Sequence, residues 1–161
     1  MNTAATHPQA GSLNLGMIGN CAISALIDDH ARMVWCCLPR FDGDPVFNAL
    51  LQPGDEGSHF AIELEELASA HQWYEPNTAI LRTQLFDKAG QGIEITDFAP
   101  RFYSRSRYFR PMTLVRRVRP IQGSPRVRVA LKVRYDWGQT CLLYTSPSPR
   151  DQRGSRMPSS A

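Results

Sequence analysis

The sequence predicts an all-β domain, folded as an antiparallel β-sandwich or barrel. Two observations support this prediction. Short runs rich in β-branched and aromatic residues, several of them alternating between apolar and polar, recur along most of the chain. Clusters of Gly, Pro, Asn and Asp, which favour turns, separate these runs. A short helix is predicted at one place only, near residue 45.

The first predicted elements form a hairpin. Gly16 and Gly19 punctuate LNLGMIGN (13–20), and AISALID (22–28) is expected to be a strand. A polar turn follows. MVWCCL (33–38) is β-rich and almost wholly apolar, as a strand covered on both faces is.

The predicted helix lies within 39–57, where Pro39 and Gly43 exclude a long regular element. Asp44 is suited to cap a short helix with Pro45 at its first position and VFNALL as its body.

Beyond this loop the chain is strand-like. The candidate strands are HFAIEL (59–64), AILRTQLF (79–86), GIEITDFA (92–99), MTLVRRV (112–118) and RVRVALKVR (126–134). The second and third flank DKAGQ, which fits a hairpin loop. EELASAHQ (65–72) is either a helical turn or a loop.

The last of these strands has the clearest alternation. One face carries Val127, Val129, Leu131 and Val133, and the other carries Arg126, Arg128, Ala130, Lys132 and Arg134. We expect a half-buried strand whose basic face is solvated.

The composition changes abruptly at Cys141. Residues 141–161 are rich in Ser, Pro and Arg without any period, a composition that by itself predicts a disordered tail. Back-translated with one codon per residue, however, CLLYTSPSPRD and SRMPSSA match two parts of a transposase-type sequencing adapter, in frame and in order. We therefore interpret 141–161 as a non-native, translated adapter. The domain is then expected to span 13–140, truncated at its C-terminal end, behind a disordered segment 1–12.

The charge balance is nearly neutral without that tail. The chain has 18 Lys plus Arg against 15 Asp plus Glu, and 141–161 holds three Arg and one Asp, which leaves 15 against 14. Such a balance does not favour nucleic-acid binding.

No stretch is long enough to span a membrane, and the first residues lack a secretion signal. The three cysteines outside the tail make a poor disulfide framework, so we expect a cytoplasmic protein. From the charge balance and the lack of an apolar span, we also expect no nucleic-acid or membrane partner.

No motif indicates a metal or another cofactor. Cys36 and Cys37 lack the spacing of a zinc site and are expected to be small buried hydrophobes. The histidines, which share no motif, are His7, His30, His59 and His71.

The most informative candidate site is the loop CLPRFDGDPVF (37–47). It places Arg40, Asp42 and Asp44 beside aromatic residues in a setting constrained by Pro and Gly. Such side chains bind sugar hydroxyls or a neighbouring domain, or they form an internal Arg–Asp clamp within the loop. The residues leave both interpretations open.

A series of motifs resembles the opening of bacterial and archaeal glucoamylase- and trehalase-like glycoside hydrolases of family fifteen. The motifs are IGN with Cys21, SALID, VWCCLPRFD, VFNALL, YEPNTAILRT, ITDFAPR and VRYDWG. They follow the family's order and cover about Leu15 to Gly138. Among the departures, Asn20 stands where the family usually has Asp, and Gly43 where it typically has Ser.

The resemblance implies a β-sandwich N-terminal domain followed by a linker and a catalytic (α/α) barrel. It also implies inverting hydrolysis of α-glucosides such as trehalose or maltooligosaccharides, which needs an acid and a base carboxyl group. In the family both lie in the barrel, so we expect no catalytic residue here and an inactive fragment of an enzyme. Its partners would be its own missing barrel and, in the full-length protein, the carbohydrate. Arg40 and Asp42 are then candidates for the domain interface or the substrate entrance.

Two other functions stay open. One is a stand-alone carbohydrate-binding or assembly module that stacks sugars on aromatic residues. Its candidates are Trp73, Tyr74, Phe102, Tyr103 and Tyr108. The other, weaker on the residues, is a nucleic-acid binder that uses the basic face of 126–134.

Overall fold

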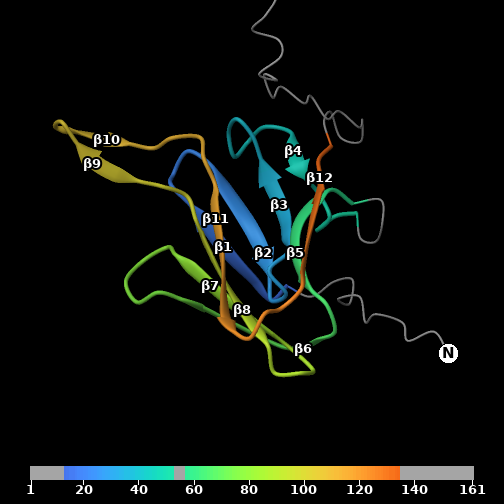
Figure 1. The fold of residues 1–161 in the computed structure, drawn as a ribbon. Helices are drawn as coiled ribbons and strands as arrows, with labels where there is room; N and C mark the ends of the chain where they lie inside the picture. The colour runs from blue at the N-terminus through green and yellow to red at the C-terminus, as the bar shows by residue number, and fades with distance from the viewer. Residues whose placement is uncertain (1–12, 53–56, 135–161) are drawn as a thin grey trace, which may run out of the picture.

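In the computed structural model, which describes residues 13–52 and 57–134, two antiparallel β-sheets pack face to face (Figure 1). The described residues contain no helix, and the all-β class and the sandwich are confirmed. Within the same residues, no helix has the length and apolar character needed to cross a membrane.

The first sheet has six strands. In spatial order they are β1 (Leu15–Gly19), β2 (Ser24–Asp28), β3 (Met33–Cys37), β5 (His59–Leu64) and β12 (Val127–Lys132), and β4 (Pro45–Phe47) pairs with β3 beside this path. The predicted hairpin of 22–28 and 33–38 is therefore confirmed as β2 and β3.

The second sheet has four strands. Their order is β11 (Val115–Gln122), β8 (Gly92–Phe98), β7 (Leu81–Asp87) and β6 (Leu67–Tyr74). The predicted hairpin across 87–91 is β7 and β8. A separate hairpin, β9 (Phe102–Ser104) with β10 (Arg107–Phe109), projects from the sandwich between β8 and β11 (Figure 1).

The helix predicted at residue 45 is wrong, because this segment is strand β4. Pro45 and Phe47 point inward and are buried, while Val46 between them is only partly buried. Phe47 lies opposite Cys36 on β3. A single helical turn is a marginal structure on its own, and burial of two apolar side chains against an existing strand stabilises the extended form instead.

The segment 65–72 is also not a helical turn or a loop, since most of it belongs to β6. This strand pairs along β7 at the edge of the second sheet, and most of its side chains are exposed. The segment shows no clear alternation because little of it is buried on either face. Its extended shape comes from backbone pairing with β7.

The core lies between the sheets. One cluster contains Ile18, Ala25, Ile27, Met33, Cys36, Phe47 and Leu81, and the other contains Ala31, Ile62, Leu64, Leu85, Ile93 and Ile95. Cys36 and Cys37 are buried as predicted. Burial and the neighbouring Cys37 raise the pKa of the Cys36 thiol to about 12, and burial also raises the pKa of Cys37. Both groups are therefore neutral thiols at physiological pH.

A buried ion pair connects the two sheets. Asp97 on β8 lies directly opposite Arg116 on β11, and their side chains are 0% and 4% exposed. Arg116 donates Nε to Asp97 Oδ1 at 2.8 Å and Nη2 to Oδ2 at 3.0 Å. Its Nη1 crosses to the first sheet and donates to the Phe60 carbonyl at 2.9 Å. Burial raises the pKa of Asp97, and the hydrogen bonds and charge of Arg116 oppose this effect.

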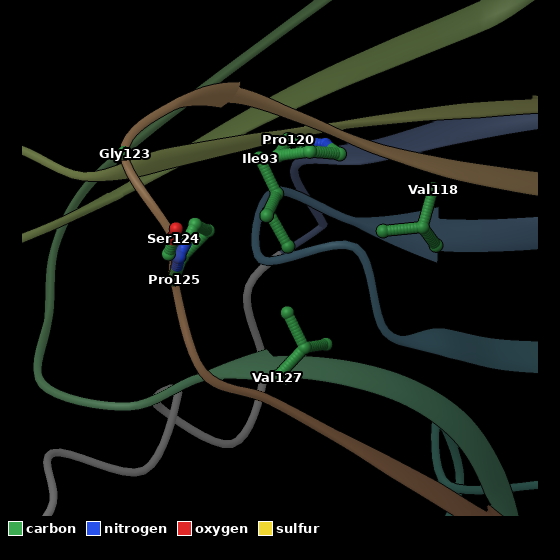
Figure 2. Close-up of a pocket in the computed structure, with 7 residues that line it drawn as sticks. All are labelled: Ile93, Val118, Pro120, Gly123, Ser124, Pro125 and Val127. Carbon is green, nitrogen blue, oxygen red and sulfur yellow. The ribbon is translucent and has the colours of Figure 1, made fainter.

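The apolar face of β12 is not buried as predicted. The faces alternate, but Val129 is 64% and Leu131 54% exposed. The strand lies at the edge of the first sheet, where β11 of the second sheet diverges from it and leaves a notch of about 250 Å³ (Figure 2). The notch is lined by Ile93, Val118, Pro120, Gly123, Ser124, Pro125 and Val127.

Replacing Asp97 with alanine is expected to lower the free energy of unfolding by about 3–5 kcal/mol, because Arg116 is left buried without its counter-charge. Urea unfolding followed by tryptophan fluorescence measures this. The matched control is Glu63→Ala, which removes the exposed pair with Arg128 and should change stability by less than about 1 kcal/mol. Equal losses in the two variants would contradict the role given to the buried pair.

Candidate interaction surface at one end of the sandwich

A buried asparagine organises one end of the sandwich. Asn20 follows β1, and its Oδ1 accepts hydrogen bonds from the backbone N–H groups of Ala22 at 3.0 Å and Ile23 at 3.2 Å. Its Nδ2 donates to the carbonyl oxygens of Pro100 at 3.1 Å and Pro111 at 2.8 Å. The turn between β1 and β2 is thereby bonded to both ends of the segment that carries the projecting hairpin.

We call residues 101–112, which include this hairpin, the arm. Its turn is made by Arg105 and Ser106, whose φ angles of 48° and 61° suit a tight two-residue hairpin loop. Beside the base of the arm, Arg101 Nη1 lies 3.2 Å from the Sγ of Cys21, in the turn that Asn20 holds.

Aromatic side chains occupy both faces of the arm. Phe102 stacks on Phe109 across the strands, with ring centroids 5.4 Å apart, and Tyr103 contacts Tyr108 at 5.0 Å. Because neighbouring residues of a strand point to opposite faces, the two pairs lie on opposite sides of the hairpin. Phe102 is 52% exposed, and Tyr103 and Tyr108 are each 63% exposed. The sandwich therefore covers neither face of the arm fully.

The arm is also strongly basic. Its four arginines, all exposed, are Arg101, Arg105, Arg107 and Arg110. The sequence contains no Asp or Glu from Phe98 to Arg134. Arg101 places its guanidinium 5.3 Å from the centroid of the Tyr108 ring. Among the described residues, no carboxylate forms an ion pair with any of these four arginines.

The predicted site residues lie at the same end of the molecule. Because β3 runs antiparallel to β2, it ends beside the β1–β2 turn, and the loop 38–44 follows there (Figure 1). In this loop Arg40 and Asp42 bind each other, with Nε–Oδ1 at 2.9 Å and Nη2–Oδ2 at 2.8 Å. The internal clamp considered from the sequence is therefore present. The exposed pair stays a predicted interface site, next to an exposed Phe41.

The aromatic residues proposed for sugar stacking do not form one surface. Tyr74 is fastened to β1, since its hydroxyl accepts from Met17 N at 2.6 Å and donates to Met17 O at 2.9 Å. Trp73 is partly buried and stacks on His71. Phe102, Tyr103 and Tyr108 belong instead to the arm.

A second charged cluster lies on the outer face of the second sheet. Glu94 is buried and accepts hydrogen bonds from Arg82 at 3.2 Å, Gln84 at 3.2 Å and Arg119 at 2.9 Å. Burial raises the pKa of Glu94, but the Gln84 bond and the charges of Arg119 and Arg82 outweigh this and hold the pKa below its usual range. The ionised carboxylate thus ties three strands together.

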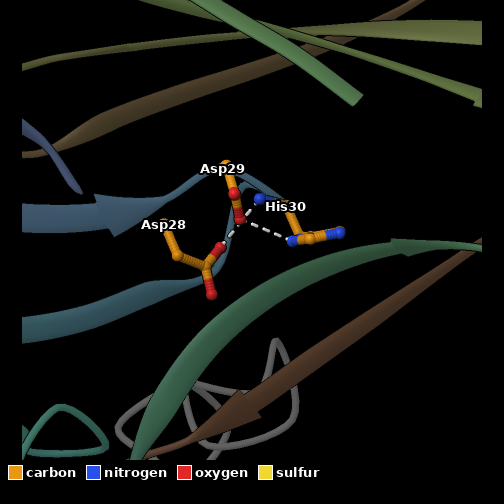
Figure 3. Close-up of side chains that lie close together, drawn as sticks. All are labelled: Asp28, Asp29 and His30. Carbon is orange, nitrogen blue, oxygen red and sulfur yellow. Dashed lines mark hydrogen bonds and ion pairs between the residues drawn. The ribbon is translucent and has the colours of Figure 1, made fainter. Parts of the chain in front are cut away.

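Asp28, Asp29 and His30 form a third cluster, with potential ligand atoms within 4.8 Å of one another (Figure 3). Asp28 Oδ1 accepts the backbone N–H groups of His30 at 3.0 Å and Arg32 at 2.8 Å. Asp29 Oδ1 lies 2.6 Å from His30 Nδ1. Burial raises the pKa of Asp28, and those backbone bonds oppose the rise. These contacts close the β2–β3 turn, and nothing in them indicates a metal.

Comparison with known proteins supplies a family. Residues 8–148 match the family described as trehalase-like, N-terminal. The chain is 30% identical over 87 residues to a trehalase of Thermoplasma volcanium, covering 53% of this chain and 14% of that protein. It is 38% identical over 92 residues to trehalase 1 of Sulfolobus acidocaldarius, covering 56% of this chain and 15% of that protein. The chain thus spans about one seventh of the length of these relatives. No solved structure matches it significantly.

Replacing Asn20 with alanine is expected to lower the free energy of unfolding by about 1–3 kcal/mol, since buried carbonyl and N–H groups lose their partner. It should also speed amide hydrogen exchange at the base of the arm, which mass spectrometry measures peptide by peptide. Asn14→Ala is the control, because it makes the same change at an exposed position before β1, at the end of that strand away from Asn20. Unchanged exchange at the arm in the Asn20 variant would contradict the anchoring role.

Proposed function

Because this chain belongs to the family of trehalase-like N-terminal domains, we propose that it is the non-catalytic N-terminal domain of a glycoside hydrolase that acts on α-glucosides. Its role is to pack against a separate catalytic domain, an (α/α) barrel by family resemblance. One observation carries the proposal: the family match takes in nearly the whole chain, yet the aligned part covers only 14% and 15% of two trehalases.

The carboxylates of the described residues support a non-catalytic role. Inverting hydrolysis needs two carboxyl groups about 6.5–9.5 Å apart, facing a space that holds the substrate bond and a water. The two buried acids among the described residues, Asp97 and Glu94, and the partly buried Asp28 are already engaged. Asp97 binds Arg116, Glu94 binds residues of both neighbouring strands, and Asp28 binds backbone N–H groups.

The end of the sandwich that Asn20 organises supports packing against another domain. It presents the arm and the loop 38–44 together, with apolar and charged side chains exposed side by side. A cluster of exposed large apolar residues marks an interaction site more often than an ordinary solvated surface. Arg40 and Asp42 lie on this end and are part of the proposed interface.

The test begins with the gene beyond the codon for Thr140 and with expression of the complete reading frame. The purified 161-residue chain should hydrolyse neither trehalose nor maltooligosaccharides, while the complete protein should hydrolyse at least one of them. Deleting 13–140 from the complete protein should lower kcat/KM or the yield of soluble enzyme by roughly tenfold or more, because an apolar interface is uncovered. Hydrolysis by the 161-residue chain alone would contradict the proposal.

A second candidate function is a carbohydrate-binding module, favoured by the exposed rings of Phe102, Tyr103 and Tyr108. Such rings can stack on sugar faces. Isothermal titration of the chain with maltoheptaose and with trehalose decides between the two. The first proposal expects no heat of binding. Saturable heat that Tyr103→Ala abolishes would instead assign the arm to sugar.

A further inference from the structure

We infer that the arm is the element through which this domain docks, and that the surface receiving it is an acidic groove of the catalytic domain. This inference rests on the proposed function and adds to it the contact element and the chemistry of its partner. The argument uses the fixed base of the arm, its unpaired arginines and its two aromatic faces.

The base of the arm has a set position. Pro100 and Pro111 are both bonded to Asn20, so the chain enters and leaves the arm at one place on the sandwich. Asp97 and Arg116, just outside these prolines, are paired in the core. Among the described residues, β9 and β10 pair only with each other. The arm is therefore a projection on a rigid base, and a partner can recognise it without the whole segment having to be ordered first.

Most of the arginines on the adjacent strands are paired, and those of the arm are not. On β11 and β12, Arg116, Arg119 and Arg128 each have a carboxylate within the domain, whereas Arg117 and Lys132 have none among the described residues. The four arginines of the arm have none among the described residues, although the guanidinium group suits bidentate pairing with carboxylates. A partner that covers these exposed arginines removes their water, and carboxylates on its surface would compensate that cost, so we expect the complementary surface to be acidic.

The side chains of the arm also indicate the shape of the partner. Tyr, Phe, Met and Arg are enriched at the centres of protein interfaces, and Lys, Asp and Glu are depleted there. Residues 101–112 contain the four enriched types and no Lys, Asp or Glu, although they include two residues of another depleted type, Ser104 and Ser106. Because Phe102 and Tyr103 lie on opposite faces and are both exposed, a flat surface could cover only one of them. A groove that takes up the hairpin covers both.

A protein partner fits better than a polyanion. Clustered Lys and Arg can also attract nucleic acids or anionic membranes, but carboxylates close to the cluster repel phosphate groups. Here the loop next to the arm carries Asp42, paired with Arg40, and the sequence before Phe98 contains most of the acidic residues. Arg117, Arg126 and Lys132 also lack an ion pair among the described residues, but the arm gathers four such arginines on one hairpin, which suits a local acidic groove.

The inference is tested with two separately expressed proteins: the 161-residue chain and the polypeptide encoded after Thr140. Their binding is measured by calorimetry at about 50 mM and about 300 mM NaCl, where screening differs strongly. The arm variant is Arg107→Glu with Arg110→Glu. The matched control is Lys88→Glu with Arg126→Glu, which makes the same charge change at exposed positions at the opposite end of β8 and β11. Arg107→Lys with Arg110→Lys keeps the charge but loses the guanidinium fork.

The arm variant, in which the charges of Arg107 and Arg110 are reversed, is expected to bind roughly tenfold or more weakly and to lose most of the salt dependence of binding. The affinity of the control variant should stay within about twofold of that of the unaltered chain. The lysine variant should fall between them. Thermal unfolding of each variant, expected to match the unaltered chain because the changed residues are exposed, shows that the fold is kept.

Three results would overturn the inference. If the unaltered chain binds the downstream polypeptide and the arm variant binds as well as the control, the arm is not the docking element, and the proposed function stands. If the unaltered chain does not bind at all, the proposed function and the inference fail together. If the arm arginines instead govern binding to a 20-mer of single-stranded DNA or to phosphatidylserine vesicles, and not to the polypeptide, the partner is a phosphate-bearing one.

Discussion

The arrangement of this domain depends on the buried pair between Asp97 and Arg116. The guanidinium group of Arg116 donates hydrogen bonds from all three of its nitrogens. Two go to the carboxylate of Asp97 on the neighbouring strand, and one goes to a backbone carbonyl of the opposite sheet. Arg116 therefore sets the register of β8 against β11 and also joins the two layers. A buried ion pair of this kind adds little net stability over a well-packed apolar pair, but loss of either member is costly. Its three bonds, two within one sheet and one to the other sheet, can all be made only when the two sheets lie as they do here.

The same pair also determines where the arm begins and ends. Asp97 is next to the last residue of β8, Arg116 is the second residue of β11, and the arm lies between them. Asn20 adds a second tie at Pro100 and Pro111, from a turn that belongs to the other sheet. A long excursion from a sheet would ordinarily be mobile, because few contacts order it. Here its two ends are held by buried polar bonds, so exposed aromatic and basic side chains stand on a defined base. A defined base of this kind is what the proposed contact with another domain requires.

Arginine has opposite roles within one stretch of this chain. On the sheets, Arg116, Arg119 and Arg128 are bonded to acids of neighbouring strands. On the arm, arginines of the same type find no acid among the described residues. The residue type alone does not distinguish the paired arginines of the sheets from those of the arm. The difference lies in whether the fold places an Asp or Glu side chain beside the arginine. The basic face predicted for 126–134 illustrates this, because Arg128 lies opposite Glu63 in the register with β5.

The sequence by itself determined the features that depend on local pattern. Period-two alternation and turn residues are properties of neighbouring positions, so β5, β7, β8 and the β2–β3 hairpin could be predicted, as could the burial of Cys36 and the family. Tertiary structure decided what depends on distant partners. Pro45 to Phe47 is a strand because β3 lies beside it, and Val129 is exposed because no described strand covers that face of β12. Asn20, visible in the sequence only as a departure from a family pattern, joins residues 80 and 91 positions away. Such contacts form only after the sheets have packed, and no local pattern encodes them.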